Sequence, residues 1–140
     1  MISSMVYQFE NVGDDLDLVP LAGRRALDSA SLKVGLAAWR SLPLARRAAI
    51  VELGAAEKID ASEVRRLAAG VEAIAWQAEP EPDSATVPAA LRAFGVDAVW
   101  WASLRSLDRW SLASMARRGK DDSVRALLVE LQGGASAVSP

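Results

Sequence analysis

The sequence predicts an all-α fold, in which about six to eight helices form a single-domain, bundle-like array behind an extended N-terminal arm. Apolar residues recur at helical spacing from Leu21 to Leu131, and no strand-like alternation is sustained. Proline, glycine and aspartate stand where such helices would begin and end. With 140 residues and 51% hydrophobic content, the chain is long enough to form one core. We expect a single domain over residues 1–132 and a disordered tail over residues 133–140.

The N-terminal segment, residues 1–18, is predicted to be an extended arm. Hydrophobic character alternates weakly around Tyr7 and Phe9, and acidic residues follow. We expect these two aromatic side chains to anchor the arm to the body. The first helix is expected from about Pro20 to Ser29, because proline suits a first helical turn, where its missing N–H costs nothing.

Three further helices are predicted in the first half of the chain. A short helix is expected over Lys33–Arg40, and another begins after Pro43 and stops at Gly54. Asp60 is a favourable N-cap, and Glu63 lies three residues later, which is the pattern of a capping box. The apolar stripe that follows predicts a helix to Ala78, which would be the longest or second-longest of the molecule.

The second half of the chain begins with a break between Pro80 and Pro88, where three prolines exclude a regular helix. We expect an exposed connection there. A short helix from Pro88 should end at Gly95. Asp97 and Asp108 are expected to cap the next two helices, and Asp121 or Asp122 is expected to start the last one.

The predicted core collects the apolar positions on the inner faces of these helices. It comprises Leu27, Leu36, Trp39, Leu42, Ile50, Leu67, Val71, Leu104, Leu107, Leu112 and Leu127. Trp100 and Trp101 point about 100° apart on a helix, so only one of them can face a given core. We interpret this pair as a core corner, and the alternative is an aromatic anchor for a partner protein.

The composition excludes most catalytic chemistry. The chain has no histidine and no cysteine, so it offers no imidazole base, thiolate nucleophile, zinc finger or disulfide. The acidic cluster Asp14, Asp15 and Asp17 lacks the spacing of a calcium loop. Glycine-rich phosphate loops and a G-x-S-x-G motif are absent from the sequence. We therefore expect no enzymatic activity, no cofactor and no metal.

The charge balance gives no general attraction to nucleic acid or to an anionic membrane. Sixteen basic and eighteen acidic residues leave a formal net charge of −2. No run approaches the roughly 18 apolar residues of a membrane span, and the first residues lack the pattern of a signal peptide. The expected location is the cytoplasm.

Arginine pairs offer a second functional hypothesis. They occur at residues 24–25, 46–47, 65–66 and 117–118. Acidic residues lie within a turn or two of each of these pairs, which favours solvated helix faces. If the pairs instead formed one continuous positive face, the chain would be a nucleic-acid-binding or regulatory interaction module.

The ordered spacing of polar and aromatic residues in two segments resembles the family of nitrate reductase-associated proteins. The residues that carry the resemblance are Phe9-Glu10, Val19-Pro20, Arg24, Leu27-Asp28, Lys33, Leu36, Trp39, Leu42 and Arg46, followed by Trp101, Leu104, Leu107, Arg109 and Leu112. The resemblance implies a small cytoplasmic helical accessory protein that binds assimilatory nitrate reductase. The family brings no established catalytic residues, and what its members do at the reductase stays open. Our candidate partner-binding residues are Phe9, Glu10, Arg24, Asp28, Lys33 and Trp39.

Overall fold

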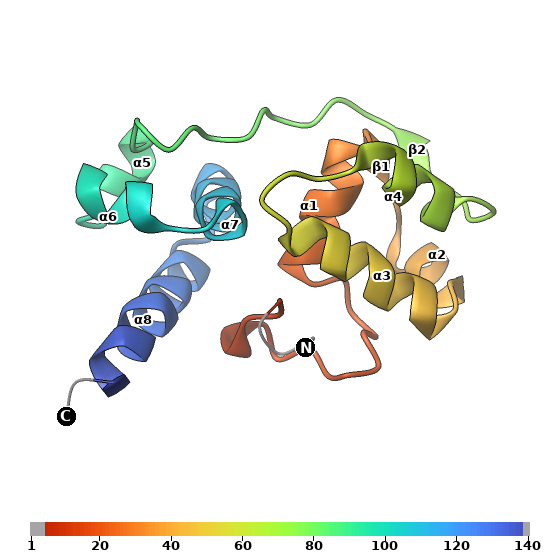
Figure 1. Ribbon diagram of the computed structural model, residues 1–140, viewed down its shortest axis with the longest axis horizontal. Coiled ribbons are helices and arrows are strands. Elements are labelled where there is room, and N and C mark those ends of the chain that lie inside the picture. The colour runs from red at the N-terminus through yellow and green to blue at the C-terminus, as the bar shows by residue number, and fades with distance from the viewer. Residues whose placement is uncertain (1–4, 139–140) are drawn as a thin grey trace.

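A computed structural model describes residues 5–138, with side chains described up to Gly133, and confirms the all-α prediction. Among these residues are eight α-helices, one two-stranded sheet and a short 3-10 turn, η2 (Gln8–Glu10) (Figure 1). The helices are α1 (Leu21–Ser29), α2 (Leu36–Ser41), α3 (Leu44–Ala55), α4 (Ala61–Ala68), α5 (Ala89–Arg92), α6 (Ala98–Ser103), α7 (Ser106–Arg117) and α8 (Asp121–Val138). The strands are β1 (Leu32–Lys33) and β2 (Ile74–Ala75).

Helix α1 is the central element, because it packs against α3, α4 and α7. Its contact with α3 is very close at Gly54, where an added Cβ would meet the backbone oxygen of Ala22 at 1.7 Å. Gly54 therefore lies within α3 as a packing position, whereas the sequence analysis expected it to end that helix. The hydrogen atom in place of a side chain is what lets the two backbones approach.

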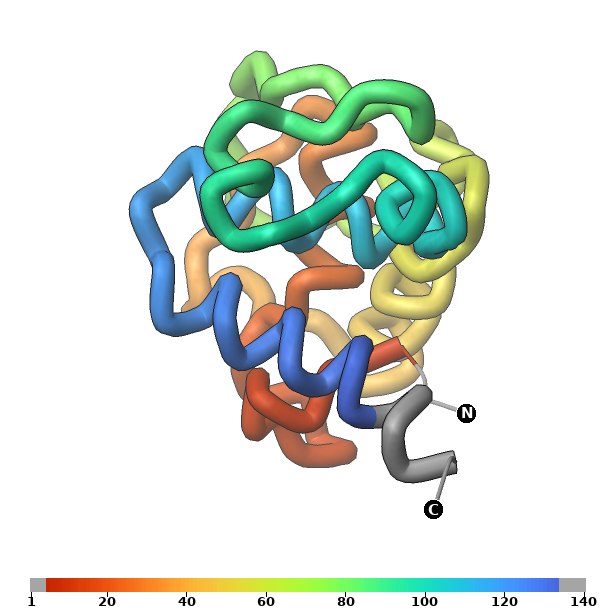
Figure 2. Tube along the Cα trace, turned by 90° about the vertical axis from the view of Figure 1, so that its left-hand side faces the viewer, coloured from red at the N-terminus to blue at the C-terminus, as the bar shows by residue number. Residues whose placement is uncertain are grey.

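The N-terminal arm is anchored as predicted. Tyr7 is buried, and its hydroxyl donates a 2.6 Å hydrogen bond to Asp108 of α7. The backbone N–H groups of Gln8 and Phe9 donate to the carboxylate of Glu130, at 2.9 Å each. These contacts hold the arm against α8, and Figure 2 shows the two segments side by side.

Two other predicted helix boundaries in the first half of the chain were wrong. Lys33 lies in β1, and the expected helix Lys33–Arg40 begins only at Leu36. The expected helix from Asp60 ends at Ala68, far short of Ala78. The longest helix is instead α8, among the residues described.

Backbone geometry explains why α4 stops early. Asp60 caps it as predicted by accepting the N–H of Glu63 at 3.1 Å. Gly70 then has a φ of +92°, which a helix does not allow. Beyond it, β2 pairs antiparallel with β1, and the N–H of Trp76 donates to Ser31. The pairing of β1 with β2 uses backbone N–H and C=O groups that would form hydrogen bonds within α4 if that helix were longer.

Helix starts in the second half follow the expected aspartates with one exception. Asp97 caps α6 by accepting the N–H of Trp100 at 2.9 Å. Asp108 lies inside the first turn of α7 and accepts the backbone N–H of Arg105, so the expectation that Asp108 precedes this helix was wrong. The backbone of α8 runs to Val138, past residue 133, where we expected the tail to begin. The last two residues of that tail lie outside the described part, and the division into one domain and a tail stays a prediction.

Most of the predicted core is buried. The confirmed positions are Leu27, Trp39, Leu42, Ile50, Leu67, Leu107, Leu112 and Leu127. Val71 and Leu104 are partly buried against this core, and Leu36 is 41% exposed because it is the first residue of α2, facing out. Trp101 is fully buried while Trp100 is only partly so, which agrees with the core-corner interpretation.

The connection over residues 80–88 is mostly exposed, as predicted, and Val87 anchors it in the core. It crosses above α7 on its way to α5 (Figure 1). Within the part of the chain that the structure describes, no helix is both long and apolar enough to cross a membrane.

Candidate functional site

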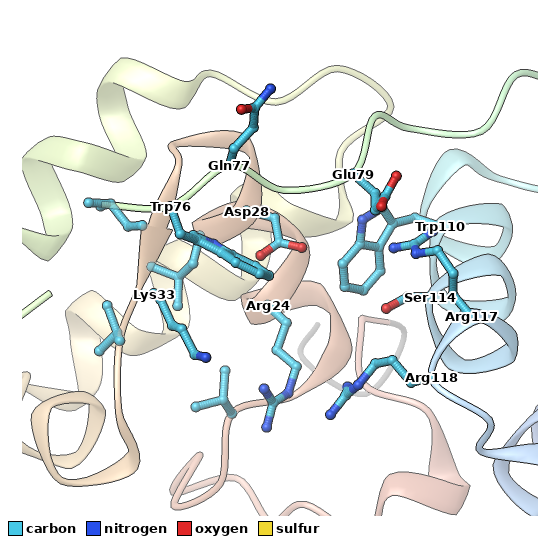
Figure 3. Close-up of a pocket in the computed structure, with 14 residues that line it drawn as sticks. Arg24, Asp28, Lys33, Trp76, Gln77, Glu79, Trp110, Ser114, Arg117 and Arg118 are labelled. Carbon is cyan, nitrogen blue, oxygen red and sulfur yellow. The ribbon is translucent and has the colours of Figure 1, made fainter. Parts of the chain in front are cut away.

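A cavity of about 440 Å³ opens between α1, the small sheet and the C-terminal end of α7. Arg24 and Asp28 reach it from α1, and Lys33 reaches it from β1. Trp76, which follows β2, and Trp110 of α7 line two of its walls (Figure 3). Its size lies within the range of about 300–1,000 Å³ that is usual for small-molecule sites.

Local structure explains why these side chains meet. Arg24 and Asp28 are four residues apart and share the outer face of α1. The pairing of β1 with β2 sets Lys33 beside the indole of Trp76, with its Nζ 5.5 Å from the ring centroid. Helix α7 ends at Arg117, and Arg118 with Gly119 turns the chain there, so both arginine side chains lie at the cavity.

The cavity holds more basic than acidic side chains, four against Asp28 and Glu79. Arg24, Lys33, Arg117 and Arg118 all line it. Within residues 5–138, none of these four side chains forms an ion pair. The pKa of Arg24 is lowered, first by burial and next by the charge of Arg118. Two cations held together at a partly dehydrated site favour an anion between them.

Asp28 is the acidic group at the centre of the site. Burial raises the pKa of its carboxyl, and the charges of Arg117, Arg24 and Arg118 oppose that shift. A hydrogen bond from the side chain of Trp76 opposes it as well. The Asp28 carboxylate is therefore partly shielded from water and can still accept hydrogen bonds from a group in the cavity.

The arrangement suits binding better than catalysis. Arginine and lysine recognise carboxylate or phosphate, and the two indoles offer flat apolar surface. In the residues that the structure describes, no cluster of three or more acidic, histidine or cysteine side chains is placed to hold a metal ion. The cavity therefore combines four cationic side chains with two indole rings and the carboxylates of Asp28 and Glu79.

Three of the six candidate partner-binding residues come together here, namely Arg24, Asp28 and Lys33. Phe9 lies apart on the arm and is half-buried beside Tyr7, with ring centroids 5.9 Å apart. It remains a candidate at a separate place.

The other two candidates have structural contacts. Glu10 accepts the backbone N–H of Leu21 at 2.7 Å and so caps the start of α1. Trp39 is fully buried, and its Nε1 donates to the carbonyl of Leu16 at 2.8 Å. The side chain of Trp39 therefore has no surface with which to touch a partner, and a direct contact role for it was a wrong expectation.

Sequence reasoning missed half of the cavity. Trp76 was placed in a long helix, while Arg117 and Arg118 were assigned to a solvated face. Trp110 was assigned to an apolar helix face, and it is buried with 4% exposure, although it also lines the cavity. No local motif marks these residues, because their meeting depends on how α7 packs beside α1.

Arg25 corrects the expectation that the arginine pairs lie on solvated faces. Its side chain is 1% exposed and donates to the carbonyls of Gly54 and Ala56 at 2.8 and 2.6 Å. It also forms a two-pronged ion pair with Glu81 of the connection, at 2.7 and 2.8 Å. This pair ties the connection to α1 beside the cavity. Of this arginine pair, Arg24 thus lies on the outer face of α1 and Arg25 is buried.

Comparison with known proteins gives one match. The family described as conserved nitrate reductase-associated protein matches residues 6–130 of the chain. No curated protein and no solved structure matches it.

Proposed function

Because the chain belongs to the family of conserved nitrate reductase-associated proteins, we propose that it is a non-catalytic accessory protein that binds assimilatory nitrate reductase in the cytoplasm. The family description itself indicates an association with nitrate reductase. The accessory role, the compartment and the binding surface are the parts that we infer.

One observation carries the proposal about the surface. Arg24, Lys33, Arg117 and Arg118 converge on one cavity without ion-pair partners among residues 5–138. Cationic side chains that form no ion pair on one protein are suited to opposite charges on another, where such charges set the association rate and the specificity. We infer that an acidic segment of the reductase approaches this side of the molecule, with Phe9 as a second, separate contact.

A role in assembling or stabilising the reductase fits the side chains present. The chain has neither histidine nor cysteine, and the cavity presents no pair of acidic groups isolated in an apolar pocket. An accessory protein needs a specific surface and a stable fold, and both are supplied by the packing of α1 and α7 around the cavity.

The nucleic-acid hypothesis receives less support from the same residues. Arg25 is buried, and Arg66 is paired with Glu63 at 2.6 Å on α4. Asp28 and Glu79 also place acidic groups in the cavity wall. These acidic groups and the Arg66–Glu63 pair interrupt the positive charge at the places named, which suits a phosphate backbone less well than an unbroken basic face would.

The proposal is tested by capture of nitrate reductase with the purified protein. We expect wild-type protein to retain the reductase, and the double variant Arg24→Gln/Lys33→Gln to retain much less. Neutral glutamine is preferable to glutamate at residue 24, because a new carboxylate would face Asp28 and Glu10. Arg66→Gln is the matched control, since it removes an exposed arginine from a different helix.

Melting curves separate binding from folding. Exposed charges contribute little to stability, so the double variant and the control should melt close to the wild type. A strain lacking the gene should show reduced nitrate reductase activity. Failure of the wild-type protein to retain the reductase, together with normal growth of that strain on nitrate, would reject the proposal.

A further inference from the structure

The cavity has two chemically different ends. Figure 3 shows the guanidinium groups of Arg24 and Arg118 approaching one another on one side, with the ammonium group of Lys33 directed to the same side. Asp28 lies further in, between the indoles of Trp76 and Trp110. A ligand that fills the space therefore meets positive charge at one end, and a carboxylate with aromatic walls at the other.

The cationic end is built for a compact anion with several acceptor oxygens. Two guanidinium groups and one ammonium group supply more donors than a single carboxylate can accept. Phosphate offers three oxygens and up to two negative charges, and arginine binds it in a two-pronged geometry. Burial and then the charge of Arg118 lower the pKa of Arg24, and such a group would relieve the repulsion between the two arginines.

The inner end is built for a planar ring that donates hydrogen bonds. Trp76 is 41% exposed and carries Lys33 near its ring, so its indole gives a surface on which a flat ring can stack. Trp110 bounds the opposite side of the cavity but is only 4% exposed, so Trp76 is the ring available for stacking. Asp28 accepts hydrogen bonds and does not donate them when ionised, and so it favours a ring edge with neighbouring N–H groups. Guanine presents two such donors on one edge, and adenine does not.

We propose that this cavity binds a free mononucleotide-type ligand, a phosphate ester of a planar heterocycle with adjacent N–H donors, as in guanosine monophosphate. The phosphate lies between Arg24, Arg118 and Lys33, and the ring stacks on Trp76 with its donor edge on Asp28. The cavity volume of about 440 Å³ accommodates a molecule of this size and greatly exceeds what a lone small anion requires. This inference goes beyond association with the reductase, because it concerns the protein alone.

Calorimetric titration of the purified full chain tests the inference. Guanosine monophosphate should bind saturably, and more tightly than adenosine monophosphate, guanosine or inorganic phosphate. Arg118→Gln should weaken guanosine monophosphate binding roughly tenfold or more, as expected for the loss of a charged hydrogen bond. Arg66→Gln, on another helix, should leave it unchanged. A melting curve for each variant establishes that it is folded.

Asp28→Asn gives the sharper result. Removal of the carboxylate should strengthen binding of inorganic phosphate, since a negative charge leaves the site. The same substitution should abolish the preference for guanosine monophosphate over adenosine monophosphate. If Asp28 only stabilised the fold, its substitution would not strengthen phosphate binding and at the same time abolish the preference for guanosine monophosphate.

Several results would overturn the inference. They are the absence of saturable guanosine monophosphate binding, equal affinity for inorganic phosphate, and an unchanged base preference in Asp28→Asn. Much tighter binding of a short guanine-containing RNA would assign the cavity to a polymer and not to a free ligand. No reductase is present in these titrations, so their failure leaves the proposed association standing, and failure of the association leaves the ligand site standing.

Discussion

The side chain of Trp39 both fills the core and holds the end of the N-terminal arm. It fills the core with 0% exposure, and its Nε1 donates to the carbonyl of Leu16. Leu16 has a φ of +51°, which is strained for a leucine, and it is fully buried. Arg47 donates to the same carbonyl at 3.1 Å. The end of the N-terminal arm is therefore held in an unfavourable conformation by packing and by two hydrogen bonds.

Truncation of Trp39 should be among the most damaging single changes. Trp39→Ala is expected to lower the free energy of unfolding by about 3–5 kcal/mol, the usual cost of removing a buried tryptophan. Leu36→Ala on the same helix should cost less than about 1 kcal/mol, because an exposed leucine buries little surface. Urea denaturation compares the two variants. Similar midpoints for both would contradict the burial of Trp39.

Arg25 provides the second prediction at this scale. Arg25→Met should destabilise the protein by about 3–5 kcal/mol, since it leaves backbone carbonyls and Glu81 without their buried donor. Glu81→Gln should cost less, because Arg25 keeps the carbonyl acceptors of Gly54 and Ala56 and the glutamine amide oxygen can still accept one of its hydrogen bonds. Thermal melting of both variants measures the difference. Equal losses would show that the ion pair, and not the carbonyl contacts, gives Arg25 its importance.

At the scale of elements, the sequence predicts helix starts better than helix ends. Asp60 and Asp97 form caps that depend on the next three residues alone, so their pattern is visible locally. The end of α4 depends on Gly70 and on β2 pairing with β1, which lies some forty residues earlier in the chain. An apolar stripe at helical spacing does not show that a strand so far away in the chain will pair with the same residues. The predicted helix was therefore too long.

The α1–α3 contact gives a prediction for this scale. Gly54→Ala should destabilise the protein by about 3 kcal/mol or more, because the new methyl group meets a backbone oxygen that cannot move aside. Gly133→Ala in α8 is the matched control, since nothing lies within 4 Å of its added Cβ. Helix propensity alone should make the control neutral or up to about 1 kcal/mol more stable. Parallel behaviour of the two variants in chemical denaturation would refute the close approach of α1 and α3.

At the scale of the whole molecule, the candidate site exists only in the assembled fold. Arg24, Asp28 and Lys33 were identifiable from the family resemblance, because they fall in one stretch of the chain. Trp110 and Arg118 join them across some eighty residues of sequence, through the packing of α7 against α1. None of the cavity cations Arg24, Lys33, Arg117 and Arg118 forms an ion pair within residues 5–138, which is the reason that we propose a binding role for them.

The affinity of the purified protein for purified assimilatory nitrate reductase tests the central claim most directly. We predict saturable binding that weakens as salt is added, since the contact is electrostatic. The double variant Arg24→Gln/Lys33→Gln should lose most of this affinity while melting like the wild type, and Arg66→Gln should retain it. Absence of binding by the wild type, or equal binding by the double variant, would contradict the account.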